Sequence, residues 1–153
     1  MLDQIKKYEF YKRQFKVKNT PYFEPFERLI QNAPKYWLEC SHKIEGSKVF
    51  STRYGLFFRN VSAEAFNKIF NFYSEVSALD NIDINYGIIK NIYNDLNFDK
   101  IKKPGCGIDY RSKIKDSRVK FWLQMSDYSQ KVHQILKIHG SSAEIRSMLK
   151  NSP

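Results

Sequence analysis

The sequence contains little cysteine, and this scarcity excludes two common ways of stabilising a fold. Its only cysteines are Cys40 and Cys106, which lie far apart and form neither a CxxC pair nor a Cys/His cluster. Such a pair predicts no zinc site and no disulfide framework. It indicates two buried free thiols instead.

Long apolar runs and glycine-rich loops are also missing. No run approaches the ~18 apolar residues that a membrane-spanning helix needs, and residues 3–18 are too polar and charged for a secretory leader. We therefore expect a cytoplasmic protein with no membrane partner. No glycine-rich loop opens a predicted helix, so a P-loop or dinucleotide fingerprint is excluded. The segment Gly105–Gly107 precedes a predicted strand and indicates a turn.

Positive charge and aromatic side chains are abundant. The formal net charge is +10 at pH 7, and aromatic residues make up 16% of the chain, with 12 Phe and 10 Tyr. Such an excess of positive charge favours an anionic partner, which could be nucleic acid, phosphate, pyrophosphate or an acidic protein. The aromatic content favours β-structure or a surface that binds apolar groups. The chain is long enough for one domain with a substantial core.

Hydrophobic periodicity predicts an α+β fold in which pairs of helices alternate with antiparallel hairpins. Gly46-Ser47 is a tight-turn signal, and Ser62 is a predicted N-cap. Four strands arranged in this way leave two open sheet edges, which argues against an isolated monomer. The single predicted domain, 1–153, contains helices at about 2–32, a hairpin at about 37–60, helices at about 62–96, a hairpin at about 106–125 and helices at about 128–150.

The second strand of each hairpin separates its side chains cleanly, because alternate residues point to opposite faces of a sheet. We expect one apolar face packed against helices and one face of basic and aromatic side chains suited to an anionic ligand. In the first hairpin, Arg53, Gly55, Phe57 and Arg59 oppose Phe50, Tyr54, Leu56 and Phe58. In the second, Arg118, Lys120, Trp122 and Gln124 oppose Val119, Phe121, Leu123 and Met125.

Several of these residues could carry chemistry. Glu45 shares a strand face with Lys43 and could act as a general base in a polar cavity. The residues alone favour the alternative, an exposed strand end beside a turn. Trp122 could stack on a base or line an apolar pocket. The basic side chains could hold phosphate oxygens or form an ordinary charged surface; they are Lys43, Arg53, Arg59, Arg111, Arg118 and Lys120.

Four segments together resemble the cyanobactin peptide prenyltransferases. They are Ser41–Gly46, Gly107–Arg111, Asp116–Lys120, and Asn19–Pro21 followed by Phe26-Glu27. No single segment is a strict signature, but their order and spacing match along nearly the whole chain. The resemblance implies the prenyltransferase (ABBA) barrel, a ten-stranded antiparallel barrel ringed by helices. The chain would supply about its amino-terminal half.

The resemblance also implies a function. Members of that family transfer a dimethylallyl or longer isoprenyl group from its pyrophosphate to a side chain of a ribosomal peptide, with Mg²⁺ assisting at the pyrophosphate. By resemblance, Glu45 would accept the proton of the acceptor. Arg118 and Lys120 would bind the pyrophosphate, joined by Arg53 or Arg59. The candidates for the isoprene and acceptor pocket are Phe57, Tyr110 and Trp122.

Half a barrel encloses no cavity, so several alternatives remain open. A separately encoded second chain could complete the barrel, or two copies of this chain could pair into a dimer. The chain could instead be an inactive truncated remnant. A different class of function is a non-catalytic basic module that binds single-stranded nucleic acid or a peptide partner.

Overall fold

The computed structural model describes residues 2–15, 17, 21–79, 87, 90–91, 94, 101–111 and 116–126. The predicted helices over 128–150, and most of the predicted helix over 84–96, lie outside these residues. None of the described helices is long and apolar enough to cross a membrane. The described elements are α1 (Leu2–Gln14), the 3₁₀ helix η1 (Pro21–Phe23), α2 (Glu24–Asn32), β1 (Tyr36–Glu45), β2 (Lys48–Phe58), α3 (Ala63–Ser77), β3 (Ile101–Arg111) and β4 (Arg118–Met125).

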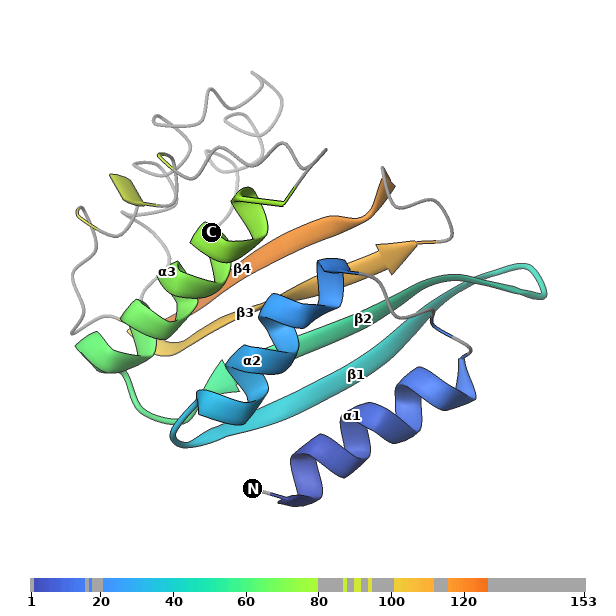
Figure 1. Ribbon diagram of the computed structural model, residues 1–153, viewed down its shortest axis with the longest axis horizontal. Helices are drawn as coiled ribbons and strands as arrows, with labels where there is room; N and C mark the ends of the chain where they lie inside the picture. Colours follow the sequence, from blue (N-terminus) through green and yellow to red (C-terminus); the bar gives the residue numbers. More distant parts are fainter. Residues whose placement is uncertain are drawn as a thin grey trace, which may run out of the picture.

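The four strands form one open sheet in the order β1-β2-β3-β4, and every neighbouring pair is antiparallel. The predicted α+β class and the two hairpins are confirmed. The prediction of a turn at Gly105–Gly107 is wrong, because β3 begins at Ile101 and these residues pair with β2. The structure also shows how the hairpins meet, because β2 pairs with β3 and Gly55 lies opposite Gly107. Figure 1 shows α2 and α3 lying over the same face of the sheet, with α1 beside β1. This arrangement is consistent with part of a barrel.

Local sequence explains where α3 begins and which side of it is buried. The Ser62 hydroxyl accepts a hydrogen bond from the backbone N–H of Ala65 over 3.1 Å, which confirms the predicted N-cap. Glu64 adds an acidic group to the first turn, where its negative charge interacts favourably with the positive end of the helix dipole. Side chains at helical spacing then face the sheet, including Phe66, Ile69, Tyr73 and Val76.

The core lies between the helices and one face of the sheet. Leu38, Leu56 and Cys106 occupy one cross-strand row of that face, and all three are buried. Both cysteines are free, as predicted. Burial raises the pKa of the half-buried Cys40 to about 11 and that of Cys106 still higher, so both thiols stay protonated near neutral pH.

A β-bulge in β2 changes the predicted position of one side chain. Lys43 pairs with Ser51 but Ile44 pairs with Val49, which leaves Phe50 as an extra residue. The Phe50 ring lies 4.8 Å from Lys43 Nζ and 4.8 Å from Arg111 Cζ. The prediction that Phe50 shares the apolar face with Tyr54 is therefore wrong, because one inserted residue reverses the alternation beyond it.

Candidate functional site

The face of the sheet opposite the helices carries its side chains in cross-strand rows. An aromatic row lies next to two charged rows, so apolar and ionic surfaces adjoin on one face. The rows run from β1 to β4. They are Trp37, Phe57, Gly105 and Trp122; then Glu39, Gly55, Gly107 and Lys120; then Ser41, Arg53, Asp109 and Arg118.

The aromatic row is continuous across the sheet. The Phe57 ring centroid lies 6.1 Å from that of Trp37 and 5.4 Å from that of Trp122. Glycines in β3 allow these rings to pack directly against the backbone of the sheet. A Cβ atom on Gly105 would come within 2.6 Å of the Phe57 ring, and one on Gly107 within 2.9 Å of the Trp122 ring. The rings therefore form a low apolar surface.

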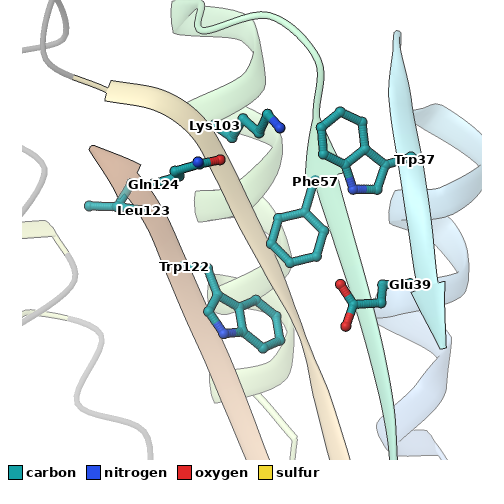
Figure 2. A pocket seen from close by; sticks show the side chains of 7 residues that line it. All are labelled: Trp37, Glu39, Phe57, Lys103, Trp122, Leu123 and Gln124. Atoms are coloured by element: carbon teal, nitrogen blue, oxygen red, sulfur yellow. The ribbon is translucent and has the colours of Figure 1, made fainter. Parts of the chain in front are cut away.

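Two adjoining hollows lie on this face and share Glu39, Phe57 and Trp122 as lining residues. Figure 2 shows the Glu39 carboxylate reaching from β1 toward the rings of Phe57 and Trp122. The shared wall makes the two hollows one continuous depression. The first, of about 300 Å³, is also lined by Trp37, Lys103, Leu123 and Gln124, and the second, of about 230 Å³, by Ser41, Arg53, Gly55 and Lys120.

A buried carboxylate organises the charges beside these hollows. Asp109 is only 1% exposed. Its Oδ2 atom lies 3.2 Å from Lys120 Nζ, 3.6 Å from Arg53 Nε and 3.9 Å from Arg111 Nη2. Three cations around a single anion leave this group, which we call the Asp109 cluster, with a positive excess. Such an excess on one face favours an anionic ligand.

The environment keeps Asp109 ionised. Burial alone would raise the pKa of this carboxyl group. The nearby Ser51 hydroxyl and the positive charges on Lys120 and Arg53 lower it by more, so the pKa of Asp109 lies below its ordinary range. Nε of Arg53 and Nε of Arg111 are buried, and neither has a hydrogen-bond acceptor among the described residues.

The structure brings together most of the predicted binding residues. Arg53 and Lys120 both line the smaller hollow and contact Asp109. Phe57 and Trp122 form the wall shared by the two hollows. Arg118 is exposed and lies opposite Asp109 in the same cross-strand row.

Three predicted residues do not join this group. Glu45 lies at the tip of the first hairpin, 53% exposed, with its Oε1 atom 2.7 Å from Lys43 Nζ. A strand rises about 3.3 Å per residue, so Glu45 is about 20 Å along β1 from Glu39. Arg59 follows the end of β2, where its side chain is exposed and its backbone N–H donates to the Lys35 carbonyl.

Tyr110 is separated from the hollows by the sheet itself. Its ring lies 5.1 Å from that of Phe23 and packs against the core on the helix-covered face. Tyr110 alternates with Asp109 along β3, and the two side chains therefore point to opposite faces. The predicted grouping of Tyr110 with Phe57 and Trp122 is not what the structure shows.

Two carboxylates at the site are not among the residues predicted from the sequence. Glu39 lies on the same face of β1 as Ser41, and Asp109 on the same face of β3 as Arg111. Their alternation was therefore available as a signal. The pairing of Arg53 with Asp109 was not, because it depends on the register between two hairpins that are separated by about 40 residues of sequence.

The buried carboxylate of the described site does not suit a divalent cation. No group of three or more potential ligating side chains occurs among the described residues. Asp109, the buried carboxylate on this face, is already surrounded by three cations. A second positive ion there would be repelled. Asp109 is therefore not a ligand for the Mg²⁺ that the resemblance implies.

Fold and site together define an α+β protein with an open antiparallel sheet, covered by helices on one face and basic and aromatic on the other. A family model described as "Family of unknown function (DUF5838)" matches residues 3–152. The chain belongs to this family. A comparison with curated proteins found no match.

Proposed function

We propose that the open face binds the isoprenyl pyrophosphate donor of a prenyltransferase, and that this chain is such an enzyme or a subunit of one. The observation that carries the proposal is the adjacency of two surfaces. Arg53 and Lys120 of the Asp109 cluster line one hollow, and the aromatic row lines the hollow that continues from it. A ligand with an anionic end and an apolar chain, such as dimethylallyl pyrophosphate, matches both surfaces.

The chemistry follows from where charge develops. Breaking the bond between C1 and the pyrophosphate oxygen leaves an allyl cation and increases the negative charge on the pyrophosphate. Lys120 and Arg53 would stabilise that negative charge. The faces of Phe57 and Trp122 would stabilise the cation and keep water away from it.

The acceptor side chain then forms a bond to C1 and loses a proton. Glu39 lines both hollows, whereas Glu45 lies at the hairpin tip. We therefore propose that Glu39, and not Glu45, accepts this proton. The acceptor would be a side chain of a ribosomal peptide of the cyanobactin type. No step here passes through Mg²⁺, because no group of three or more potential ligating side chains occurs among the described residues.

An open sheet cannot by itself protect an allyl cation from water. The proposal therefore includes closure of the open face, by a second chain or by another copy of this one. If neither occurs, the protein would still bind the donor but would not transfer its isoprenyl group. The inactive remnant is thus distinguished from the enzyme by turnover and not by binding.

Donor binding is tested by titrating the purified chain with dimethylallyl pyrophosphate and following heat or tryptophan fluorescence. Lys120→Gln should weaken binding about tenfold, the effect of losing one charge-assisted contact. Arg59→Gln removes the same charge outside the site and should change binding less than about twofold. Equal effects of the two substitutions would show that only overall charge matters.

Turnover is tested by the mass increase of a cyanobactin-type peptide incubated with the donor, Mg²⁺ and the assembled protein. Glu39→Gln should abolish the product without weakening donor binding, because it removes the proton acceptor and no positive charge. Glu45→Gln is the matched control and should retain activity. Loss of activity in Glu45→Gln alone would restore the assignment made from resemblance.

The aromatic row also supports a second candidate, a module for single-stranded nucleic acid. Trp37, Phe57 and Trp122 are spaced across the sheet beside cations, as stacking platforms for successive bases would be. An oligonucleotide held in this way should dissociate steeply as salt rises. If dimethylallyl pyrophosphate binds at micromolar concentration and an oligonucleotide does not displace it, the prenyl donor is favoured.

A further inference from the structure

Asp109 is an unusual residue to find within a basic ligand site. It is acidic and buried, and its Oδ2 atom faces the very cations that would hold a phosphate. Two roles are compatible with this position. Asp109 could compete with the ligand for the cations, or it could hold them in place before the ligand arrives.

Exposure distinguishes the two roles. The side chain of Asp109 is 2% exposed, whereas those of Lys120 and Arg53 are 27% and 40% exposed. The carboxylate thus lies beneath the cations, on the sheet, and each cation keeps a side open to the hollow. A ligand can approach Lys120 and Arg53 without displacing Asp109. This layering favours a supporting role over competition.

Long basic side chains need such support to form a defined site. Lysine and arginine lose side-chain entropy when a ligand fixes them, and that loss weakens binding. Contacts to a buried carboxylate bring about part of this ordering in the free protein. Arg111 is held from a second side as well, because its guanidinium lies 4.8 Å from the Phe50 ring at the bulge.

We propose that Asp109 is a positioning residue that holds Lys120 and Arg53 toward the hollow, so that they meet the pyrophosphate end of the ligand together. The identity of the ligand rests on the proposed function, but the positioning role requires only that the ligand carries a phosphate end. Inorganic pyrophosphate, which has no apolar chain, therefore tests it separately.

The experiment measures the affinity of the full chain for inorganic pyrophosphate and for dimethylallyl pyrophosphate by calorimetry. Asp109→Asn keeps the shape and removes the charge. Positioning predicts about tenfold weaker binding of pyrophosphate, whereas competition predicts tighter binding because a negative charge is lost. Unchanged or tighter binding in Asp109→Asn would overturn the inference.

A double-mutant cycle gives a readout that loss of packing alone would not produce. If Asp109 acts through Lys120, Asp109→Asn should weaken pyrophosphate binding by less than about threefold in a chain that already carries Lys120→Gln. Additive costs in the double variant would show that Asp109 does not act through Lys120. The thermal midpoint of each variant, measured in parallel, shows whether it is folded.

A second comparison applies if Asp109→Asn fails to fold. Arg118 is opposite Asp109 in the sheet, but among the described residues it makes no ion pair. Lys120→Gln should therefore weaken pyrophosphate binding several-fold more than Arg118→Gln, although both remove one positive charge. Equal losses would overturn the positioning role.

The two ligands separate the proposals. If the chain binds dimethylallyl pyrophosphate no more tightly than pyrophosphate, the proposal that the ligand is a prenyl donor is wrong. The positioning role of Asp109 is then unaffected. A wild-type chain that binds neither compound would overturn both.

Discussion

Lys7 of α1 donates a hydrogen bond from its ammonium group to the main-chain carbonyl of Leu38 in β1 over 3.0 Å. The N–H of the same Leu38 donates to Gln4 Oε1 over 3.2 Å. β1 is at the edge of the sheet, so both backbone groups point away from β2. Two side chains of α1 thus take the place of a neighbouring strand at this residue, which protects an edge that could otherwise pair with another chain.

Removing this protection should promote self-association. Gln4→Ala combined with Lys7→Ala leaves the N–H and carbonyl of Leu38 available to another strand. We expect a concentration-dependent rise in solution mass by light scattering, together with a loss of about 1 kcal/mol of unfolding free energy for each hydrogen bond. Lys6→Ala removes an exposed lysine from the same helix and should change neither quantity. An unchanged mass in the double variant would show that β1 does not need α1 as a guard.

An ion pair between a buried lysine and a half-buried glutamate joins α1 to α2. Lys12 is 5% exposed and forms an ion pair with Glu27, which also accepts a hydrogen bond from the Tyr8 hydroxyl. Glu27→Gln leaves the Lys12 charge without a counter-ion, and we expect it to lower the unfolding free energy by about 2 kcal/mol in urea denaturation.

The matched control for that change is Glu24→Gln in the same helix. Glu24 lies 3.7 Å from Arg28 in an exposed pair and should contribute less than about 0.5 kcal/mol. Similar losses in Glu27→Gln and Glu24→Gln would mean that burial of Lys12 adds nothing to the pair.

Alternation along single strands was sufficient to predict much of this fold. It identified the basic and aromatic face, including Arg53, Phe57, Lys120 and Trp122, because a strand side chain has only two directions to choose from. Its failures have physical causes as well. The bulge reversed Phe50, since one extra residue cannot be detected by counting.

The site itself required the register between β2 and β3. The contact between Arg53 and Asp109 exists because these residues are opposite each other in different hairpins, which no local pattern specifies. Only the resemblance and the strand face point to Glu45. Its distance from the hollows along β1 becomes evident only when the cavities are located.

Gly107 should tolerate no side chain. A Cβ atom at this residue would lie 2.0 Å from the Tyr54 carbonyl oxygen and 2.9 Å from the Gly55 Cα atom, both of them backbone. We expect Gly107→Ala to cost about 3 kcal/mol or more, because β2 and β3 must separate to admit the methyl group. Urea denaturation measures the cost, and near-ultraviolet circular dichroism reports the displaced Trp122 ring.

Gly55→Ala provides the comparison for that prediction. The nearest atom to its Cβ is the Phe57 Cε2 atom at 3.0 Å, which belongs to a side chain that can move. The loss should be smaller, at about 1 kcal/mol. A loss in Gly55→Ala as large as that in Gly107→Ala would contradict the distinction between backbone and side-chain contacts.

His42 should make the stability of the fold depend on pH in the mildly acidic range. It lies on the helix-covered side of β1, where its ring contacts Phe15 and its Nδ1 atom is 3.2 Å from Thr52 Oγ1. Burial lowers the pKa of His42 from its ordinary value of about 6.5, because a charged imidazole is disfavoured there. In the unfolded chain the same group takes up its proton at the ordinary value.

The sign of the effect follows from this difference. Above the unfolded pKa the neutral ring contributes its full stability, and that contribution is lost as the pH falls through the lower folded pKa, because the unfolded chain binds the proton more readily. We expect the unfolding free energy of the wild type to fall between pH 7 and pH 5 by more than that of His42→Gln. Urea denaturation of the two proteins at several pH values measures the difference. The other histidines are present in both proteins, so their titration cancels. Parallel pH profiles would show that His42 titrates alike in the folded and unfolded chains.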